Sequence, residues 1–140
     1  MSEEKRIVKS YEEEMQSLND DLVKMGSLTE SQLSDTIQAI VKIDKEAAEN
    51  IVKNDAQINE LRAKIDDQIS TVLVKRAPMA IDLRTTISSL KISHDLERIG
   101  DLAKSVAKKI EPLPIDLPPE LTGSLKSCLL YTSPSPRDAT

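Results

Sequence analysis

Two acidic residues, Glu97 and Asp101, stand four positions apart in a stretch whose apolar residues recur with helical spacing. On a helix they lie one turn apart on the same side, where like charges destabilise by about 0.2–0.5 kcal/mol unless something offsets them. Carboxylate oxygens are ligands that Mg²⁺, Mn²⁺ and iron prefer. The spacing therefore suits a hard cation. It suits equally well a solvated surface pair with Lys104 and Lys108 as ordinary helix partners.

A second polar group lies in the preceding helical stretch. Asp55, Asn59 and Asp66 fall within about 40° of one another on a helix and border its apolar stripe. They are therefore placed to face Glu97 and Asp101 across the groove between two helices. We expect Asp55 to be the contributor from this helix to any metal site.

The single histidine, His94, precedes Glu97 by three residues. It is either a supplementary ligand or a boundary histidine with a water or backbone partner. Di-iron carboxylate proteins use Glu-x-x-His pairs on two helices, but here the order is reversed and occurs once. The sequence shows no nucleophile beside a base and no glycine-rich phosphate loop. We therefore expect neither an enzyme nor a catalytic residue.

Three amphipathic stretches must position these side chains. Their apolar residues recur at steps of three and four, which predicts helices near 10–43, 45–76 and 78–110. Short connections make neighbouring helices antiparallel. The predicted fold class is all-α, an antiparallel three-helix bundle over residues 1–112.

The predicted helix ends rest on capping residues. Ser10 with Glu13 three residues later has the spacing of a capping box, Asp44 can cap the second helix, and Pro78 suits the first turn of the third. Gly26 interrupts the first helix, so either the helix bends there or a neighbouring helix packs close to it.

The apolar pattern also predicts the core. We expect the greatest burial at Leu18, Leu22, Ile37, Ile58, Ile65, Leu96 and Ile99. Three further residues of the third helix project to a different side, which predicts a semi-exposed apolar patch of Leu83, Ile87 and Leu90.

Composition narrows the class of protein. The chain has 140 residues, no Phe and no Trp, so its core must be aliphatic, and its net charge of −5 argues against a general nucleic-acid binder. A single cysteine cannot form an internal disulfide and favours a reducing compartment. No apolar run approaches the ~20 residues needed to cross a bilayer, and the N-terminus lacks a signal-peptide core. We expect a cytoplasmic protein.

The C-terminal segment breaks the helical pattern. We expect residues 113–127 to be a linker and residues 128–140 to be a disordered tail. From Cys128 the sequence CLLYTSPSPRD agrees residue for residue with a translated transposase-type sequencing adapter, so we interpret 128–140 as read-through rather than natural coding sequence.

The third helical stretch contains Asp82-Leu83-Arg84, Leu90-Lys91-Ile92 and Asp95-Leu96-Glu97-Arg98-Ile99-Gly100-Asp101. The order and spacing of these segments resemble the signature of the PhoU family, and the 97–101 segment is similar to the acidic metal-binding motif of that family. Met25-Gly26-Ser27-Leu28 and Asp55-Ala56-Gln57-Ile58-Asn59 resemble further family segments, although the family more often has Asp at the position of Asn59.

The resemblance implies a fold and a function. PhoU proteins contain two three-helix repeats, so this chain would be the N-terminal repeat of a six-helix protein that forms a homodimer at full length. It implies a negative regulator of phosphate uptake and phosphate-starvation signalling. The implied partners are a phosphate ABC transporter ATPase and a sensor histidine kinase, so contact with the inner membrane would be peripheral and through partners. The implied cofactor is a divalent or trivalent metal ion (iron, Mn or Mg) at Glu97, Asp101 and Asp55. A plain helical scaffold without a metal role remains the alternative.

Overall fold

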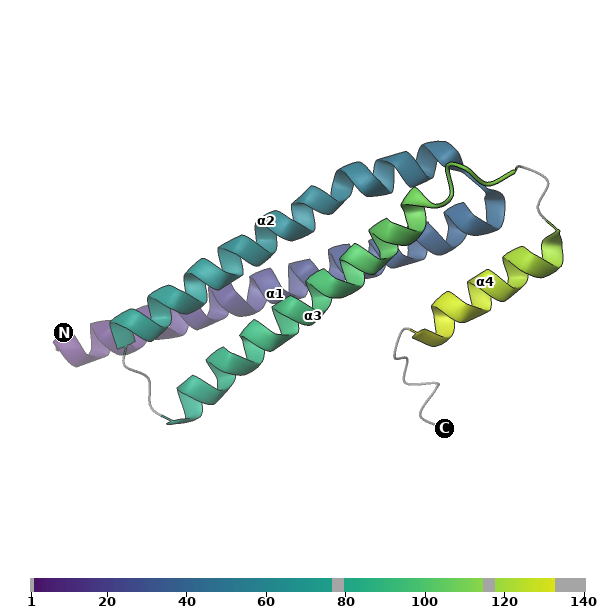
Figure 1. The fold of residues 1–140 in the computed structure, drawn as a ribbon. Helices are drawn as coiled ribbons and strands as arrows, with labels where there is room; N and C mark the ends of the chain where they lie inside the picture. The colour runs from purple at the N-terminus through teal and green to yellow at the C-terminus, as the bar shows by residue number, and fades with distance from the viewer. Residues whose placement is uncertain (1, 77–79, 115–117, 133–140) are drawn as a thin grey trace. The chain divides into compact units, whose positions relative to one another are not determined.

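The computed structural model describes residues 2–76, 80–114 and 118–132, and within these ranges every regular element is a helix. The helices are α1 (Glu3–Lys42), α2 (Lys45–Arg76), α3 (Ala80–Lys108) and α4 (Pro119–Thr132), as Figure 1 shows. The first three are long and amphipathic. The expected fold class, an all-α antiparallel three-helix bundle, is confirmed.

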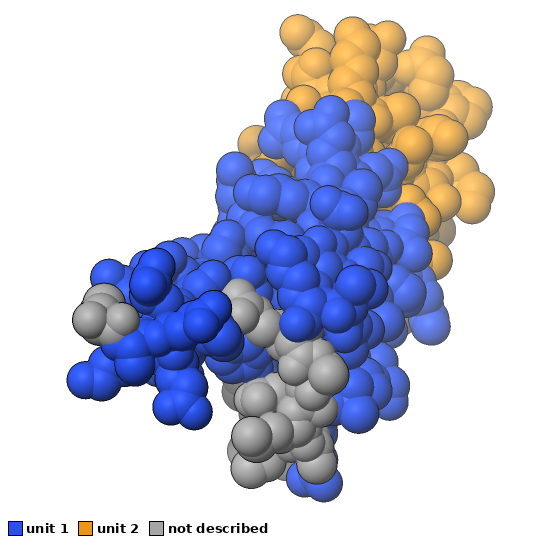
Figure 2. Space-filling model, turned by 90° about the vertical axis from the view of Figure 1, so that its left-hand side faces the viewer, with its two compact units in different colours: residues 1–30, 56–100 blue, residues 31–55, 101–140 orange. Residues whose placement is uncertain are grey.

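The chain divides into two compact units, coloured separately in Figure 2. Unit 1 comprises Met1–Glu30 and Ala56–Gly100, and unit 2 comprises Ser31–Asp55 and Asp101–Thr140. Each of the three long helices contributes one segment to each unit. The two units are described separately below.

The core of unit 1 is built mainly by α1 and α2. Its buried residues are Leu18, Met25, Ile58, Leu61, Ile65 and Ile69. α3 contributes the half-buried Leu90 and Leu96, while its fully inward positions hold small polar residues, Thr86, Ser89 and Ser93. The Ser89 and Ser93 hydroxyls donate to carbonyls of their own helix, Thr85 O at 2.9 Å and Leu90 O at 2.8 Å. Both buried hydroxyls therefore have a hydrogen-bond partner.

The burial of side chains in the structure corrects part of the predicted core. Leu18, Ile58 and Ile65 are buried as expected. The other four predicted core residues are only half-buried: Leu22, Ile37, Leu96 and Ile99. In α3 the reason is that Thr86, Ser89 and Ser93 occupy the inward positions, which pushes the larger aliphatic side chains to its flanks.

The semi-exposed apolar patch also follows the sequence pattern in part. Leu83 and Ile87 are 39% and 41% exposed. Leu90 is half-buried, because it packs against the core of unit 1. Of the three residues predicted to form the patch, Leu83 and Ile87 are therefore exposed and Leu90 is part of the packed side of the helix.

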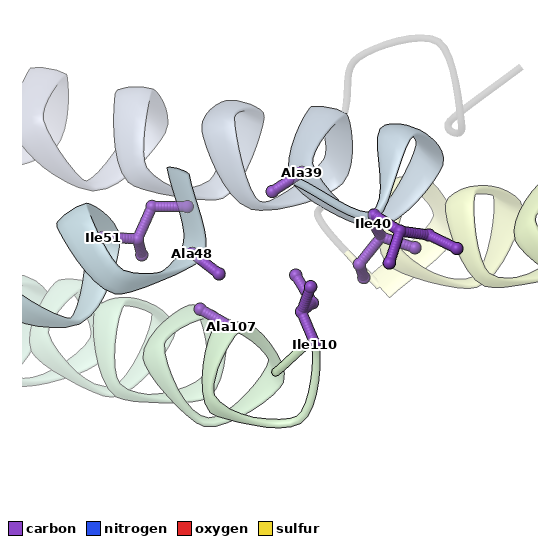
Figure 3. Packing of buried hydrophobic residues seen from close by; sticks show 7 residues of the cluster. Ala39, Ile40, Ala48, Ile51, Ala107 and Ile110 are labelled. Carbon is purple, nitrogen blue, oxygen red and sulfur yellow. The ribbon is translucent and has the colours of Figure 1, made fainter. Parts of the chain in front are cut away.

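The core of unit 2 gathers small and branched aliphatic side chains from α1, α2 and α3 and from the turns that follow α1 and α3 (Figure 3). Its buried residues are Ala39, Ile40, Ile43, Ala48, Ile51, Ala107 and Ile110. Alanines at facing positions let helix backbones approach closely, and the isoleucines fill the space between them. None of these core residues is aromatic, in keeping with a chain that has no Phe, no Trp and only two Tyr.

The connection from α1 to α2 is a tight cap inside unit 2. Ile43 has a φ of 51°, and the amides of Ile43 and Asp44 donate to the carbonyls of Ile40 and Ala39, the hydrogen bonds of a Schellman motif. A β-branched residue is strained in this conformation, but Ile43 is buried in the core, which offsets the strain. The Asp44 carboxylate then accepts the Ala47 amide at 3.0 Å. The predicted cap at Asp44 is confirmed.

Two other helix starts differ from the predictions. α1 begins at Glu3, not at Ser10, because no breaker precedes Ser10 and Ser2 Oγ accepts the Lys5 amide as an N-cap at 3.4 Å. The predicted start at Pro78 lies outside the described residues, and α3 is helical from Ala80.

The C-terminal segment also differs from the expected linker and tail. α4 covers Pro119–Thr132, with Pro119 and Glu120 in its first turn, positions that suit both residue types. Its described side chains are exposed, including Leu121 and Cys128. The expected linker therefore contains helix, and so does the start of the expected tail. Residues 133–140 lie outside the described residues, and the read-through interpretation stays a prediction.

Gly26 gives the first test of the fold. α1 continues through this residue, and a Cβ added there meets no atom within 4 Å, so no neighbouring helix approaches it closely. We predict that Gly26→Ala stabilises the chain by about 0.5–1 kcal/mol, because Ala loses less backbone entropy than Gly in a helix. Urea unfolding followed by circular dichroism measures the change. A destabilised variant would contradict the open surroundings of Gly26.

Candidate functional site

Glu97 forms an ion pair with an arginine of the neighbouring helix in unit 1. Arg62 Nη1 of α2 lies 3.1 Å from Glu97 Oε2 of α3. The other two guanidinium nitrogens face further side chains, Nη2 lying 3.4 Å from His94 Nε2 and Nε lying 3.9 Å from Asp66 Oδ2. We call Arg62, Asp66, His94 and Glu97 the Arg62 cluster. One guanidinium thus contacts three side chains from two helices.

The Arg62 cluster is partly shielded from water. The Glu97 side chain is 21% exposed and that of Arg62 is 34% exposed. Arg62 Nε and Asp66 Oδ1 are buried atoms without a hydrogen-bond partner, since their nearest charged contacts are at 3.9 and 3.6 Å. His94 Nε2 can accept a hydrogen bond from Arg62 Nη2 in the tautomer that leaves Nε2 without a hydrogen, and it lies 3.6 Å from Asp66 Oδ1. His94 therefore has side-chain partners. The sequence alone leaves open whether it is a supplementary metal ligand or a boundary histidine with a water or backbone partner.

Asp55 is the most deeply buried carboxylate of the predicted site. It lies in unit 2 and is 1% exposed. Gln32 Nε2 of α1 donates to its Oδ1 at 2.9 Å, and Lys104 Nζ of α3 lies 3.5 Å from its Oδ2. Such burial of a charge is tolerable only with charged or hydrogen-bonding partners. Three helices of unit 2 therefore meet at Asp55.

The remaining predicted residues are at the surface. Asp101 is an exposed residue of unit 2, and Asn59 is an exposed residue of unit 1. Lys104, which the sequence offered as a partner for Glu97 and Asp101, pairs with Asp55 instead. Sequence reasoning missed Arg62 and Gln32. The only local signal for Arg62 is Asp66 four residues later.

The donor chemistry suits a hard cation, but the arrangement does not present a ready cation site. Within residues 2–76, 80–114 and 118–132, no three Asp, Glu, His or Cys side chains are grouped so that they could hold a metal ion. Glu97 faces Arg62 and Asp55 faces Lys104, so protein cations already stand beside both carboxylates. The metal site at Glu97, Asp101 and Asp55 stays a prediction.

The fold and these contacts define a class: a three-helix bundle domain whose inward carboxylates are paired with cationic side chains of neighbouring helices. The family profile described as "PhoU domain" matches residues 22–110. The chain belongs to the PhoU domain family.

Relatives with known names support this assignment. The chain is 40% identical over 102 residues to a "Phosphate-specific transport system accessory protein PhoU homolog" of Caulobacter vibrioides, covering 73% of this chain and 44% of the relative. A protein of the same name from Xylella fastidiosa (strain Temecula1) is 38% identical over 121 residues, covering 86% of this chain and 50% of the relative. The chain thus spans about half the length of these relatives.

A solved structure shows the same fold. The crystal structure of PhoU from Pseudomonas aeruginosa matches with a TM-score of 0.70 at 30% identity, covering 86% of this chain and 61% of that one.

The buried ion pair of unit 2 provides a stability test. We predict that Lys104→Met destabilises the chain by on the order of 2–3 kcal/mol, because Asp55 would keep a buried charge without its ammonium partner. This is below the ~3–5 kcal/mol of a fully buried pair, since Lys104 retains access to water. Lys108→Met, an exposed lysine on the same helix, is the matched control and should change stability by less than about 0.5 kcal/mol. Equal effects of both substitutions in urea unfolding would contradict the role of Lys104.

Proposed function

We propose that this chain is one PhoU domain of a non-enzymatic regulator of phosphate uptake and phosphate-starvation signalling. The observation that carries the proposal is the similarity to proteins named as accessories of a phosphate-specific transport system, at 34–40% identity. The proposed contacts are with the ATPase of a phosphate ABC transporter and with a sensor histidine kinase, on the cytoplasmic side of the inner membrane. At full length the protein is proposed to form a homodimer.

The surface of the bundle supports action through protein contacts. In unit 1, apolar side chains of α1 and α3 are exposed, with Val23 at 63% and Ile92 at 50%. In unit 2, Leu102 of α3 is 58% exposed. Exposed aliphatic side chains of this size are a common component of protein interfaces. None of the described helices is both long enough and apolar enough to span a membrane. The family resemblance implies that membrane contact is made through partners alone, and we propose the same here.

A binding measurement tests this proposal. The chain and a complete homologue are immobilised separately, and the purified transporter ATPase and the cytoplasmic part of the sensor kinase are passed over each. We expect saturable binding of at least one partner to the chain, weakened by Ile92→Asp, because a charge opposes burial of that apolar surface. An Asp substitution at Val74, which is 85% exposed on α2, is the control. Failure of both partners to bind either protein would contradict the proposal.

We also propose that Glu97, Asp101 and Asp55 bind a hard cation, iron, Mn²⁺ or Mg²⁺, as the family resemblance implies. The support is the acidic spacing in α3 and the oxygen donors, which match the preference of such ions. Because Arg62 and Lys104 stand beside two of the carboxylates, a cation would bind there only after displacing these side chains.

The metal proposal has its own test. The double substitution Glu97→Gln and Asp101→Asn should remove bound metal from protein purified without chelator and leave helicity almost unchanged, because Asp101 is exposed and Glu97 lies at the edge of the core. Elemental analysis gives the metal content, and circular dichroism gives the helicity. Unchanged metal stoichiometry would contradict the assignment.

A plain helical scaffold is the second candidate. The contacts of Asp55 with Gln32 and Lys104 favour it, because they balance the buried charge by protein groups alone. Metal-free wild-type protein that still binds its partners would support the scaffold over the metal-dependent regulator.

A further inference from the structure

A groove lies between α1 and α3 in unit 1. It has a volume of about 420 Å³. The α1 side is lined by long aliphatic side chains, Met15, Leu18 and Leu22, and the α3 side by the small residues Thr85 and Ser89. Because protein interiors are close-packed, a hollow of this size at the surface marks a place that a further protein surface can fill.

The aliphatic surface continues beyond the groove on both helices. Val23 follows the groove residue Asn19 by four positions, and Ile92 follows the groove residue Ser89 by three, so helical spacing places each on the side of its helix that borders the groove. The two side chains are 63% and 50% exposed. Gly26 comes three residues after Val23, and a Cβ added there meets no atom within 4 Å. The chain itself therefore leaves this side of α1 open.

The helices on the two sides of the groove carry opposite charges. In α1, residues 11–23 contain five acidic residues and no basic one, whereas residues 83–92 of α3 contain two basic residues and no acidic one. Lys91 is exposed, and so is Asp20, which accepts a hydrogen bond at 2.9 Å from the groove residue Gln16. The groove is therefore bordered by an acidic helix segment and by a basic one.

We propose that this groove binds a second copy of the chain, with α1 of each copy packed against α3 of the other. A surface whose two edges have opposite charge is complementary to itself, because a two-fold axis along the groove brings each acidic edge against a basic one. The inference rests on the homodimer proposed above, for which it names the surface. It requires neither a transporter, nor a kinase, nor a metal ion.

The order of residues along the groove identifies the charged pair. α1 and α3 run in the same direction (Figure 1), and residues 15–22 of α1 lie beside residues 85–89 of α3. A two-fold axis along the groove keeps residues at the same height, so Asp20 of one copy faces Lys91 of the second copy. The symmetry repeats this contact, and the exposed aliphatic side chains beside the groove become buried between the copies.

The proposal is tested by sedimentation velocity of the full chain across a concentration series. A reductant is present so that the exposed Cys128 cannot cross-link two copies. We expect a monomer–dimer equilibrium whose Kd rises on the order of tenfold in Asp20→Lys and in Lys91→Asp, because each substitution turns two symmetric attractions into repulsions. An equimolar mixture of the two variants should dimerise like the wild type, since in the mixed dimer both contacts again join opposite charges.

The matched controls are Asp67→Lys and Lys75→Asp, which make the same charge changes at exposed positions of α2 in unit 1. Within the described residues α2 does not line the groove, so both controls should dimerise like the wild type. Circular dichroism verifies that every variant is folded.

Three results would overturn the proposal. The first is a loss of dimer in the controls equal to that in the groove variants, and the second is a mixture of the two groove variants that stays monomeric. The third is a chain that is monomeric at every concentration. A complete homologue measured in parallel then decides the homodimer separately, because a dimeric homologue keeps it and a monomeric one removes it. A dimer that all the variants leave unchanged means that the homodimer stands on another surface.

Discussion

A carboxylate taken out of water needs a positive or hydrogen-bonding partner, and this constraint governs how the helices of this bundle meet. Asp55 is almost fully buried in unit 2, with Gln32 and Lys104 beside it on two other helices. Leaving such a charge unpartnered would cost several kcal/mol, comparable to the whole stability of a small domain. A shift of one helix along another that separated these partners would therefore be strongly disfavoured. The polar contact thus helps to fix the register of the helices in unit 2, which aliphatic contacts alone would define less well.

The side of α3 that packs against the other helices also avoids unpaired buried polar groups. Small residues, among them Thr86 and Ser93 in unit 1 and Ala103 and Ala107 in unit 2, take its inward positions. Serine hydroxyls that bond to their own helix backbone need no partner from a neighbouring helix. The larger aliphatic side chains of α3, such as Ile87, Ile92 and Leu102, are consequently exposed. A helix with this pattern can pack inward and still offer apolar contacts to a protein partner.

Much of the fold could be predicted from the sequence, because apolar periodicity and capping chemistry are local. The three helices, the cap at Asp44 and the burial of Leu18, Ile58 and Ile65 all follow from residue spacing. The start of α1 could not be located, since the Ser10–Glu13 spacing also occurs inside a long helix. The apolar spacing places Leu96 and Ile99 in the core, whereas in the structure α3 turns small polar residues inward.

The candidate site was less predictable than the fold, because its partners come from different helices. The acidic pair in α3 is visible in the sequence, but the contact of Glu97 with Arg62 depends on the register of α2 against α3. Helix spacing allows Lys104 to pair with Asp101 on its own helix, but in the structure its ammonium lies beside the buried Asp55 of α2. Periodicity along one helix carries no information about these distances.

The chain pairs its inward carboxylates Glu97 and Asp55 with its own cationic side chains, and we therefore expect it to fold without metal. Thermal unfolding of the chain with and without excess chelator tests this claim directly. We predict full helicity at low temperature and the same unfolding midpoint in both samples, within about 2 °C. Loss of helicity on chelation, or a midpoint lowered by more than about 4 °C, which corresponds to roughly 1 kcal/mol in a chain of this length, would contradict it.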